Sequence, residues 1–293
     1  MQKIISIFAF LFLFGCIDTA KQEQTAILID TAYNHLENQD TLRSKERELG
    51  KKVSYEEEKA DSLRLLKVLT RALLYAEKNM NKKSFLHEFE LLAEDSSYNV
   101  SAQLMFGNLF ENKRMHLLIR RIIPGGTVLN IYLLQNNGFK PLIERAQLGM
   151  TYVNDTLRDV NGDKYKDFLV HWYPSSGCCL ADIYNVYLYQ TETGSFTTDY
   201  KFINPTFSPD EKVIRGLEYG HPGEAGIYKY KWNGLRVDTI EFMYLSSNQK
   251  GKFIKTKRST FKPNEKQGTI MNSLPNEYKK MDSLALSWFL ATF

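Results

Sequence analysis

Apolar positions along the chain change from a helical period to a strand period near residue 113. Between Thr25 and Met80 they recur every three or four residues, which predicts a pair of antiparallel helices. The second helix has the clearer pattern, with a capping box at Ser54 and Glu57 followed by an apolar stripe of Leu63, Leu66, Leu69, Leu73 and Ala76. A third helix is expected over residues 84–94. The pattern therefore predicts a helical region over residues 25–112.

From about Arg114 the period is two, which is typical of half-buried strands. Asn137-Gly138 and Asn233-Gly234 stand between such strands, and this dipeptide favours a two-residue hairpin turn. Short strands separated by turn residues predict a mainly antiparallel β-domain over residues 113–262, either propeller-like or a sandwich. Pro275 opens a final helical segment, so residues 263–293 are expected to form a linker and a C-terminal helix. The predicted fold class is α+β.

The N-terminus has the pattern of a secretion signal. Lys3 precedes an apolar run of about ten residues, which is the length of a signal peptide core and too short to span a bilayer. The following Leu13-Phe14-Gly15-Cys16 resembles the lipobox of bacterial lipoproteins. The resemblance implies a signal peptide at residues 1–15, lipidation at Cys16, and a lipidated tether at residues 16–24. The alternative is a buried N-terminal helix that contains a cysteine.

The same resemblance implies a place in the bacterial cell envelope, with the membrane as a partner through the lipid on Cys16. Ile17, in place of an aspartate after the lipidated cysteine, favours the outer membrane, facing the periplasm. The composition, with 43% apolar and 25% charged residues, is that of a soluble globular chain. A net charge of +4 is small for a nucleic-acid-binding protein, so we expect no nucleic acid among the partners.

The segment DVNGDKYKD has the spacing of a calcium loop. Asp159, Asn161 and Asp163 stand at its first, third and fifth positions, and Tyr165 and Asp167 at its seventh and ninth. Side-chain oxygens from positions one, three, five and nine, with the carbonyl of position seven, predict a calcium site. Lys164 departs from the pattern, because the sixth position usually holds a glycine. The alternative is a solvated turn without an ion, since Asp and Asn favour turns by themselves.

Running directly into the apolar strand after it, this loop resembles the calcium loops of FG-GAP and VCBS-type β-propeller repeats. It also resembles a bacterial periplasmic β-propeller-like family with a single such loop. Weaker matches extend the resemblance over Val153 to Phe242: Tyr187-Leu188-Tyr189, Thr193-Gly194-Ser195-Phe196, Asn204-Pro205-Thr206-Phe207 and the segment Tyr228 to Gly234. Some members of that family inhibit cell-wall-degrading hydrolases. The resemblance implies a non-catalytic module that binds an envelope or secreted protein.

The two remaining cysteines, Cys178 and Cys179, are adjacent in the sequence. In an oxidising envelope we expect either a vicinal disulfide, which would close the loop rigidly, or an intermolecular pair. No other cysteine or histidine has a spacing that would complete a metal site with them.

Catalytic motifs are weak throughout the chain. His171 lies close to Ser175 and Ser176, but no G-x-S-x-G elbow surrounds either serine, so we interpret it as a strand histidine. The glycine-rich segment Gly216 to Gly226 carries Glu218, His221 and Glu224 and is interpreted as a connector that could line a binding surface. The sequence thus predicts a non-catalytic, lipid-anchored binding or inhibitor module with a calcium-stabilised β-domain. The alternatives are an envelope glycan hydrolase that uses unrecognised carboxylates, and a scaffold presented by the helices.

Overall fold

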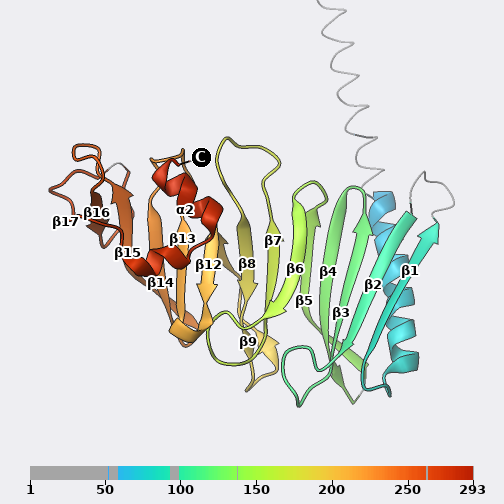
Figure 1. The fold of residues 1–293 in the computed structure, drawn as a ribbon. Helices are drawn as coiled ribbons and strands as arrows, with labels where there is room; N and C mark the ends of the chain where they lie inside the picture. The colour runs from blue at the N-terminus through green and yellow to red at the C-terminus, as the bar shows by residue number, and fades with distance from the viewer. Residues whose placement is uncertain (1–51, 53–58, 93–98, 137, 262, 293) are drawn as a thin grey trace, which may run out of the picture. The chain divides into compact units, whose positions relative to one another are not determined.

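The computed structural model describes residues 52, 59–92, 99–136, 138–261 and 263–292 (Figure 1). The chain divides into two compact units, Met1–Ser62 and Leu63–Phe293. In the first unit the described residues are 52 and 59–62, and all of them are helical. The predicted signal peptide, the tether with Cys16 and the first predicted helix lie outside the described residues.

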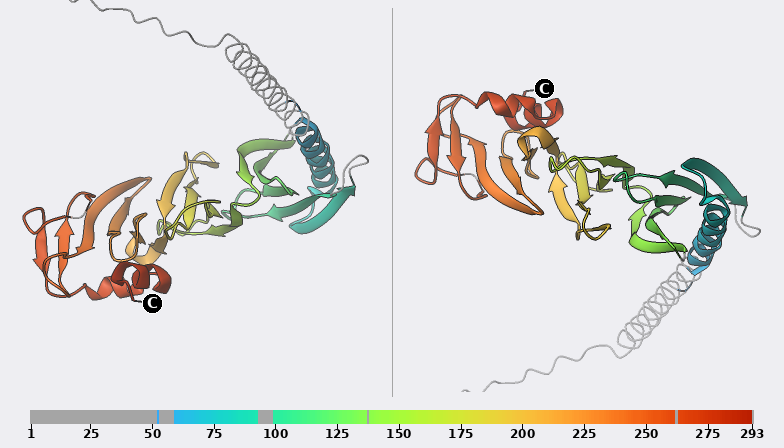
Figure 2. Two further views of the ribbon diagram at one scale, coloured as in Figure 1. Left: turned by 90° about the horizontal axis from the view of Figure 1, so that it is seen from above. Right: turned by 90° about the horizontal axis from the view of Figure 1, so that it is seen from below.

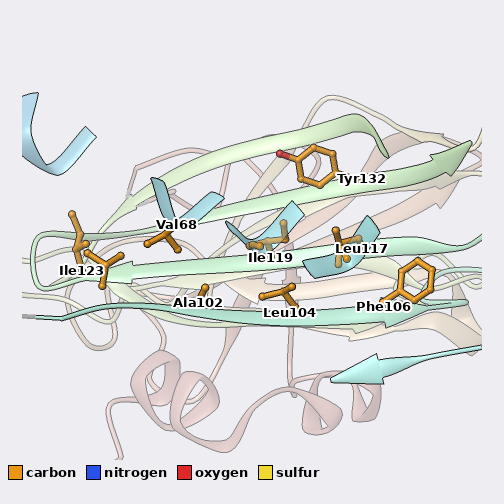
Figure 3. Close-up of a cluster of buried hydrophobic side chains, with 11 residues drawn as sticks. Val68, Ala102, Leu104, Phe106, Leu117, Ile119, Ile123 and Tyr132 are labelled. Atoms are coloured by element: carbon orange, nitrogen blue, oxygen red, sulfur yellow. The ribbon is translucent and has the colours of Figure 1, made fainter. Parts of the chain in front are cut away.

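The second unit begins with a helical segment over residues 63–79, which packs on a sheet. Val68, Ala72 and Ala76, spaced by four, are fully buried in one cluster with strand residues such as Leu104 and Ile119. Figure 3 shows the side chains from the helix and from the strands meeting in this cluster. The predicted apolar stripe matches this core face only in part. Ala76 is buried and Leu69 and Leu73 pack against the cluster, but Leu63 and Leu66 are 54% and 56% exposed, because the core face follows Val68 and Ala72. Within the described residues, no helix combines the length and the apolar character that crossing a membrane requires.

The sheet under this helix is a five-stranded antiparallel meander. Its strands, in spatial as in chain order, are β1 (Phe85–Leu92), β2 (Asn99–Gly107), β3 (His116–Ile123), β4 (Gly126–Gln135) and β5 (Gly138–Leu148). The predicted third helix over residues 84–94 is wrong, because this segment is β1. Its apolar residues fit either period, and pairing with β2, in which Phe85 lies opposite Phe106, selects the strand. The predicted helical region 25–112 thus contains two strands.

The next strands form a four-stranded sheet and a small ribbon. The sheet has the order β11-β8-β7-β6, from β6 (Tyr152–Arg158), β7 (Asp167–Trp172), β8 (Ile183–Tyr187) and β11 (Tyr200–Ile203); β9 (Tyr189–Gln190) pairs with β10 (Ser195–Phe196). Arg120 of β3 joins the first two sheets through two 2.6 Å hydrogen bonds to the buried Asp155 of β6. Phe168 and Val170 of β7 share a buried cluster with Leu129 of β4, so these two sheets share a core.

A six-stranded antiparallel sheet completes the second unit. Its strands are β12 (Pro205–Ser208), β13 (Val213–Leu217), β14 (Ile227–Asn233), β15 (Arg236–Leu245), β16 (Phe253–Thr256) and β17 (Thr269–Met271), with the short 3-10 helix η1 (Pro209–Glu211) between the first two. The predicted β14–β15 hairpin is confirmed, but its two-residue turn is Gly234-Leu235, because Asn233 pairs with Arg236 and Gly234 has a left-handed φ of 60°. β17 lies in the segment predicted to be a linker.

The chain ends on this sheet with η2 (Asn276–Lys280) and α2 (Ser283–Leu290). The predicted C-terminal helix is present, and it begins after Asp282, whose side chain caps the amides of Leu284 and Ala285. Both views in Figure 2 place α2, in dark red, on one side of the sheet, where Phe289 packs in a cluster with Ile227. The α+β class, mainly antiparallel, is confirmed. The described strands form open sheets, without a closed barrel or propeller among them.

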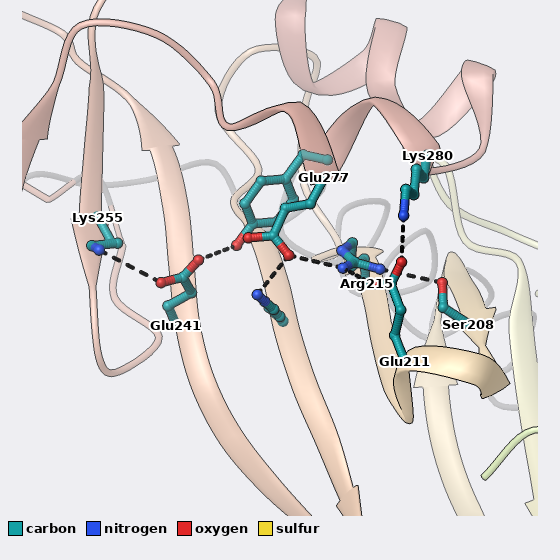
Figure 4. A network of polar contacts seen from close by, with 9 residues as sticks. Ser208, Glu211, Arg215, Glu241, Lys255, Glu277 and Lys280 are labelled. Carbon is teal, nitrogen blue, oxygen red and sulfur yellow. Dashed lines mark hydrogen bonds and ion pairs between the residues drawn. The ribbon is translucent and has the colours of Figure 1, made fainter. Parts of the chain in front are cut away.

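An ion-pair network around the buried Arg215 joins this C-terminal segment to the sheet (Figure 4). Arg215 of β13, with 2% of its side chain exposed, donates to Glu277 of η2 at 2.8 Å and also to Glu211 of η1. Glu277 also pairs with Lys229 of β14, and Glu211 with Lys280. A buried guanidinium needs such partners, because an unpaired charge in the interior costs several kcal/mol.

Candidate functional site

The predicted calcium loop connects β6 to β7 and closes on its own amides. The Asp159 carboxylate accepts hydrogen bonds from the backbone N–H groups of Gly162, at 2.7 Å, and Lys164, at 2.8 Å. Lys164 has a φ of 75°, the left-handed conformation in which calcium loops usually place glycine. A side chain there costs about 1 kcal/mol, so the loop adopts this backbone despite its residue at position six.

The middle of the loop is held by Asn161 and Asp163. Oδ1 of Asp163 accepts from the Tyr165 N–H at 2.9 Å, and its other oxygen accepts from the Asn161 amide at 2.9 Å. The Asn161 oxygen accepts from the Asp163 N–H at 3.1 Å. Gly162 presses against η1, because a Cβ on it would lie 2.2 Å from the Pro209 carbonyl oxygen. The loop therefore has a defined conformation and a fixed neighbour.

Asp167, the ninth residue of the loop, makes contacts that the sequence pattern did not predict. It is fully buried, and its two carboxylate oxygens accept from the N–H groups of Val160 and Tyr189, each at 3.0 Å. Burial raises the pKa of this carboxyl to about 7, and the nearby charges of Asp163 and Asp159 add to the rise. Asp167 thus ties the loop to β9.

The fit of the loop to calcium is partial. Oxygens bound to one calcium ion at 2.3–2.6 Å lie at most about 5 Å apart. The carboxylates of Asp159, Asp163 and Asp167 do not gather within such a distance, whereas the left-handed backbone at Lys164 is the one that calcium loops use at position six. Asp167 departs from it because its oxygens are directed to backbone amides. Calcium binding stays a prediction.

A second group of ligand atoms does converge, and spacing alone did not reveal it. Among the described residues, Cys178, Cys179 and His221 are the one group of three His, Cys, Asp or Glu side chains whose ligand atoms all lie within 4.8 Å of one another. The two Sγ atoms are 2.9 Å apart, and Cys179 Sγ is 3.9 Å from His221 Nδ1. Both cysteines are free thiols, since a disulfide bond is about 2.05 Å long. The vicinal disulfide stays a prediction.

Next to this group lies a pocket of about 490 Å³ over the ends of β13 and β14. It is lined by Lys201, Phe202, Ile203, Glu218, Tyr219, Gly220, His221, Glu224, Ala225, Gly226, Tyr228, Tyr230, Tyr244, Ser259, Thr260 and Phe261. Helix α2 fixes the loop that forms one wall: the Trp288 indole donates to the Gly220 carbonyl at 2.9 Å, and the Gly223 N–H donates to the Trp288 carbonyl at 2.9 Å. The glycine-rich connector thus lines a pocket.

Two glycines make room for the tyrosine rings in this pocket. A Cβ on Gly216 would lie 2.2 Å from the ring of Tyr228, its cross-strand partner, and a Cβ on Gly226 would lie 2.2 Å from the ring of Tyr244. Real Cβ atoms do not approach so closely, so any larger residue would displace the rings. The rings of Tyr228 and Tyr230 are stacked, with centroids 4.5 Å apart. The aromatic floor of the pocket therefore depends on glycines in and beside the sheet.

Glu218 organises the polar side of the pocket. One of its carboxylate oxygens accepts from the Tyr244 hydroxyl at 2.9 Å, and the other accepts from the Ser259 hydroxyl at 2.5 Å. The Tyr244 oxygen also accepts from the Thr260 N–H at 3.0 Å, and burial raises the pKa of this tyrosine to about 12. Both oxygens of the carboxylate are therefore engaged in positioning neighbours.

His171, which lies close to Ser175 and Ser176 in the sequence, is held by contacts within its own sheet. His171 Nε2 lies 2.7 Å from an oxygen of Asp182, and its ring stacks on Tyr184 with centroids 4.3 Å apart. The serines at 175 and 176 lie on the exposed part of the following loop. The interpretation of His171 as a satisfied strand histidine agrees with these contacts.

In comparisons with known proteins, the chain matches no protein-family model, no curated sequence and no solved structure.

Proposed function

We propose that this protein is a non-catalytic binding module of the bacterial envelope, anchored by a lipid on Cys16, and that the tyrosine-lined pocket receives an anchor side chain of a partner protein. The main observation that supports this proposal is the pocket. Tyrosines with buried, hydrogen-bonded hydroxyls give a large apolar surface at low cost in side-chain entropy, and such residues are enriched at the centres of protein interfaces. Tyr219, with 52% of its surface exposed, stands at the mouth of the pocket, which the proposal places at the centre of the interface.

The state of Glu218 favours binding over hydrolysis. A glycosidase needs two carboxyl groups roughly 5 to 9.5 Å apart, one to donate a proton and one to act as nucleophile or base. Both oxygens of Glu218 already accept hydrogen bonds from Tyr244 and Ser259. The partner is an envelope or secreted protein, as the resemblance to hydrolase inhibitors implies, and glycan hydrolysis is the competing outcome of the test.

A crosslinking experiment tests the pocket. A photoreactive amino acid at position 219 identifies the captured envelope protein, and the affinity of the purified pair is then measured for Tyr219→Ala and for Tyr165→Ala. Tyr165 is 38% exposed and lies on the loop between β6 and β7, so it is the matched control. We expect Tyr219→Ala to weaken binding about tenfold or more, as for a central interface residue, and Tyr165→Ala to leave it unchanged.

Equal affinities for the two variants would remove the pocket from the interface. Turnover of peptidoglycan fragments that disappears in Glu218→Gln would replace the proposal with the hydrolase alternative.

The proposal includes a structural calcium ion at Asp159, Asn161 and Asp163, with the Tyr165 carbonyl. Its support is the sequence spacing and the left-handed Lys164. By binding only the folded loop, the ion would stabilise the protein and fix the contact of Gly162 with η1. We also propose that the protein is related to the propeller-like family with a single calcium loop, and that it is located at the outer membrane.

Thermal unfolding with calcium and with chelator tests the ion. At one hundred times the Kd, calcium adds about 2.7 kcal/mol, which corresponds to a rise in Tm of about 5–10 °C for a chain of this size. Asp159→Asn should abolish the rise, and Glu192→Gln, which changes an exposed carboxylate elsewhere, should keep it. An identical Tm with calcium and with chelator would show that the loop closes on its hydrogen bonds alone.

The lipid anchor has its own test. Incorporation of labelled fatty acid into the wild-type chain, and its loss in Cys16→Ala, is the expected result. Labelling that persists in the variant would place the lipid elsewhere.

A further inference from the structure

Cys178, Cys179 and His221 come from two separate loops. The cysteines lie between β7 and β8, and the histidine lies 42 residues after Cys179, between β13 and β14. Cys179 is buried, whereas Cys178 and His221 are exposed. One side of the group is therefore open to solvent, and the other is held in the protein.

Both loops are fixed where they meet. The Tyr173 hydroxyl donates to the Cys179 carbonyl at 3.2 Å, which holds the cysteine loop to the end of β7. The His221 carbonyl accepts from the N–H groups of Glu224 and Ala225 at 3.0 and 3.1 Å, and the same loop is anchored on α2. The Tyr219 hydroxyl lies 3.0 Å from the position a Cβ would take on Gly177, so the two loops are in contact beside the thiols.

We propose that Cys178, Cys179 and His221 bind one thiophilic d10 cation, Cu(I) or Zn(II), with an open coordination position toward solvent. Two thiolates and an imidazole are the ligand types that these ions prefer over calcium or magnesium. Binding requires both thiols to lose their protons, which leave to solvent, while the imidazole binds in its neutral form. This site is separate from the loop proposed for calcium and goes beyond the binding function of the pocket.

The geometry needs one adjustment. Two thiolates bound at about 2.3 Å to one ion stand on the order of 3.8–4.0 Å apart, which is about 1 Å more than the present 2.9 Å between the Sγ atoms. The exposed Cys178 can supply this change by turning its side chain toward solvent. The 3.9 Å between Cys179 Sγ and His221 Nδ1 already suits two ligands of one ion.

Metal titration of the full chain tests the site. A Cys16→Ser background leaves two thiols, and the chain is reduced and desalted without oxygen. Cu(I) is then titrated against a chromophoric competing chelator, and Zn(II) against a fluorescent one in a parallel series. We expect one equivalent of metal to bind, and the series with the higher affinity identifies the ion.

The variants decide whether all three residues are ligands. Cys178→Ser and Cys179→Ser should each lose stoichiometric binding. His221→Ala should weaken it by at least about tenfold, since even residues that only support a ligand change affinity by 10–100-fold. His171→Gln, a histidine already paired with Asp182, is the matched control and should keep full affinity. Far-ultraviolet circular dichroism and Tm confirm that each variant is folded.

Three results would overturn the proposal. The first is a reduced wild-type chain that takes up neither metal. The second is a His221→Ala variant of unchanged affinity, which would mean that the thiols chelate alone. The third is a cysteine pair that stays oxidised in excess reductant, which would establish the vicinal disulfide instead.

Discussion

His116 makes the folded chain sensitive to acid. It lies in β3 with no exposed surface, edge-on to the rings of Phe110 and Tyr189, and neither ring nitrogen has a partner in hydrogen-bond geometry. Burial lowers the pKa of His116 from 6.5 to about 4. The nearby charge of Glu111 and the backbone of Arg114 offset part of this effect, and the charge of Arg114 adds to it. As pH falls, His116 is therefore protonated in the unfolded chain at a higher pH than in the folded chain.

The loss of stability follows from the two pKa values. A histidine with a depressed folded pKa contributes stability that is present above the unfolded pKa and disappears as pH falls toward the folded pKa. Between pH 7 and pH 5, a change from 6.5 to about 4 corresponds to a loss of about 2 kcal/mol. Asp167, with its raised pKa, acts in the opposite direction over the same range, so the wild-type curve alone is not diagnostic.

Urea unfolding of the wild type and of His116→Leu, at pH 7 and pH 5 in chelator, isolates the histidine. Leucine removes two buried ring nitrogens without breaking a hydrogen bond, so the variant should fold. Relative to the wild type, it should gain about 2 kcal/mol between pH 7 and pH 5, because its titration is absent. If the difference in unfolding free energy between the two chains is the same at pH 7 and pH 5, His116 has the same pKa in the folded and unfolded chains, and the reasoning is refuted.

Three further substitutions test the packing. Asp155→Ala removes the carboxylate partner of Arg120, whose side chain is 16% exposed, and should cost about 3 kcal/mol in urea unfolding; a negligible cost would show that this ion pair does not hold the two sheets together. Lys164→Gly removes a left-handed side chain and should raise the calcium-free stability by up to about 1 kcal/mol; a decrease would mean that the lysine side chain itself stabilises the loop. Gly226→Ala should displace Tyr244, cost about 1–3 kcal/mol and abolish partner binding, whereas Gly125→Ala, with open space around its Cβ position, should do neither.

Local periodicity predicted the elements whose pattern was unambiguous. The helix ending at residue 79 and the β14–β15 hairpin follow directly from apolar spacing and from Asn233-Gly234. β1 was mispredicted, because Phe85 and Phe89 are spaced for a helix and equally for one face of a strand. Its state is decided by pairing with β2, which is a tertiary contact that no local pattern contains.

The candidate sites also depend on contacts between residues that are distant in the sequence. Asp159 and Asp163 lie in the predicted loop, but Asp167 is turned to the amides of Val160 and Tyr189, and the latter is distant in sequence. His221 reaches the cysteines only because the β7–β8 and β13–β14 loops meet in the folded chain. The tyrosines of the pocket carried a signal that was read only as strand propensity. Gly216, over which the Tyr228 ring lies, is its partner on the neighbouring strand, and strand pairing cannot be read from local sequence.

Trp288 of helix α2 holds the Gly220–Gly223 turn, which forms one wall of the pocket and lies about seventy residues earlier in the chain. A stop codon or a protease cut just before α2 would release that wall without removing a single residue that lines the cavity. C-terminal tags and truncations are therefore not neutral choices for this protein, because they act directly on the part of the surface where a partner would enter.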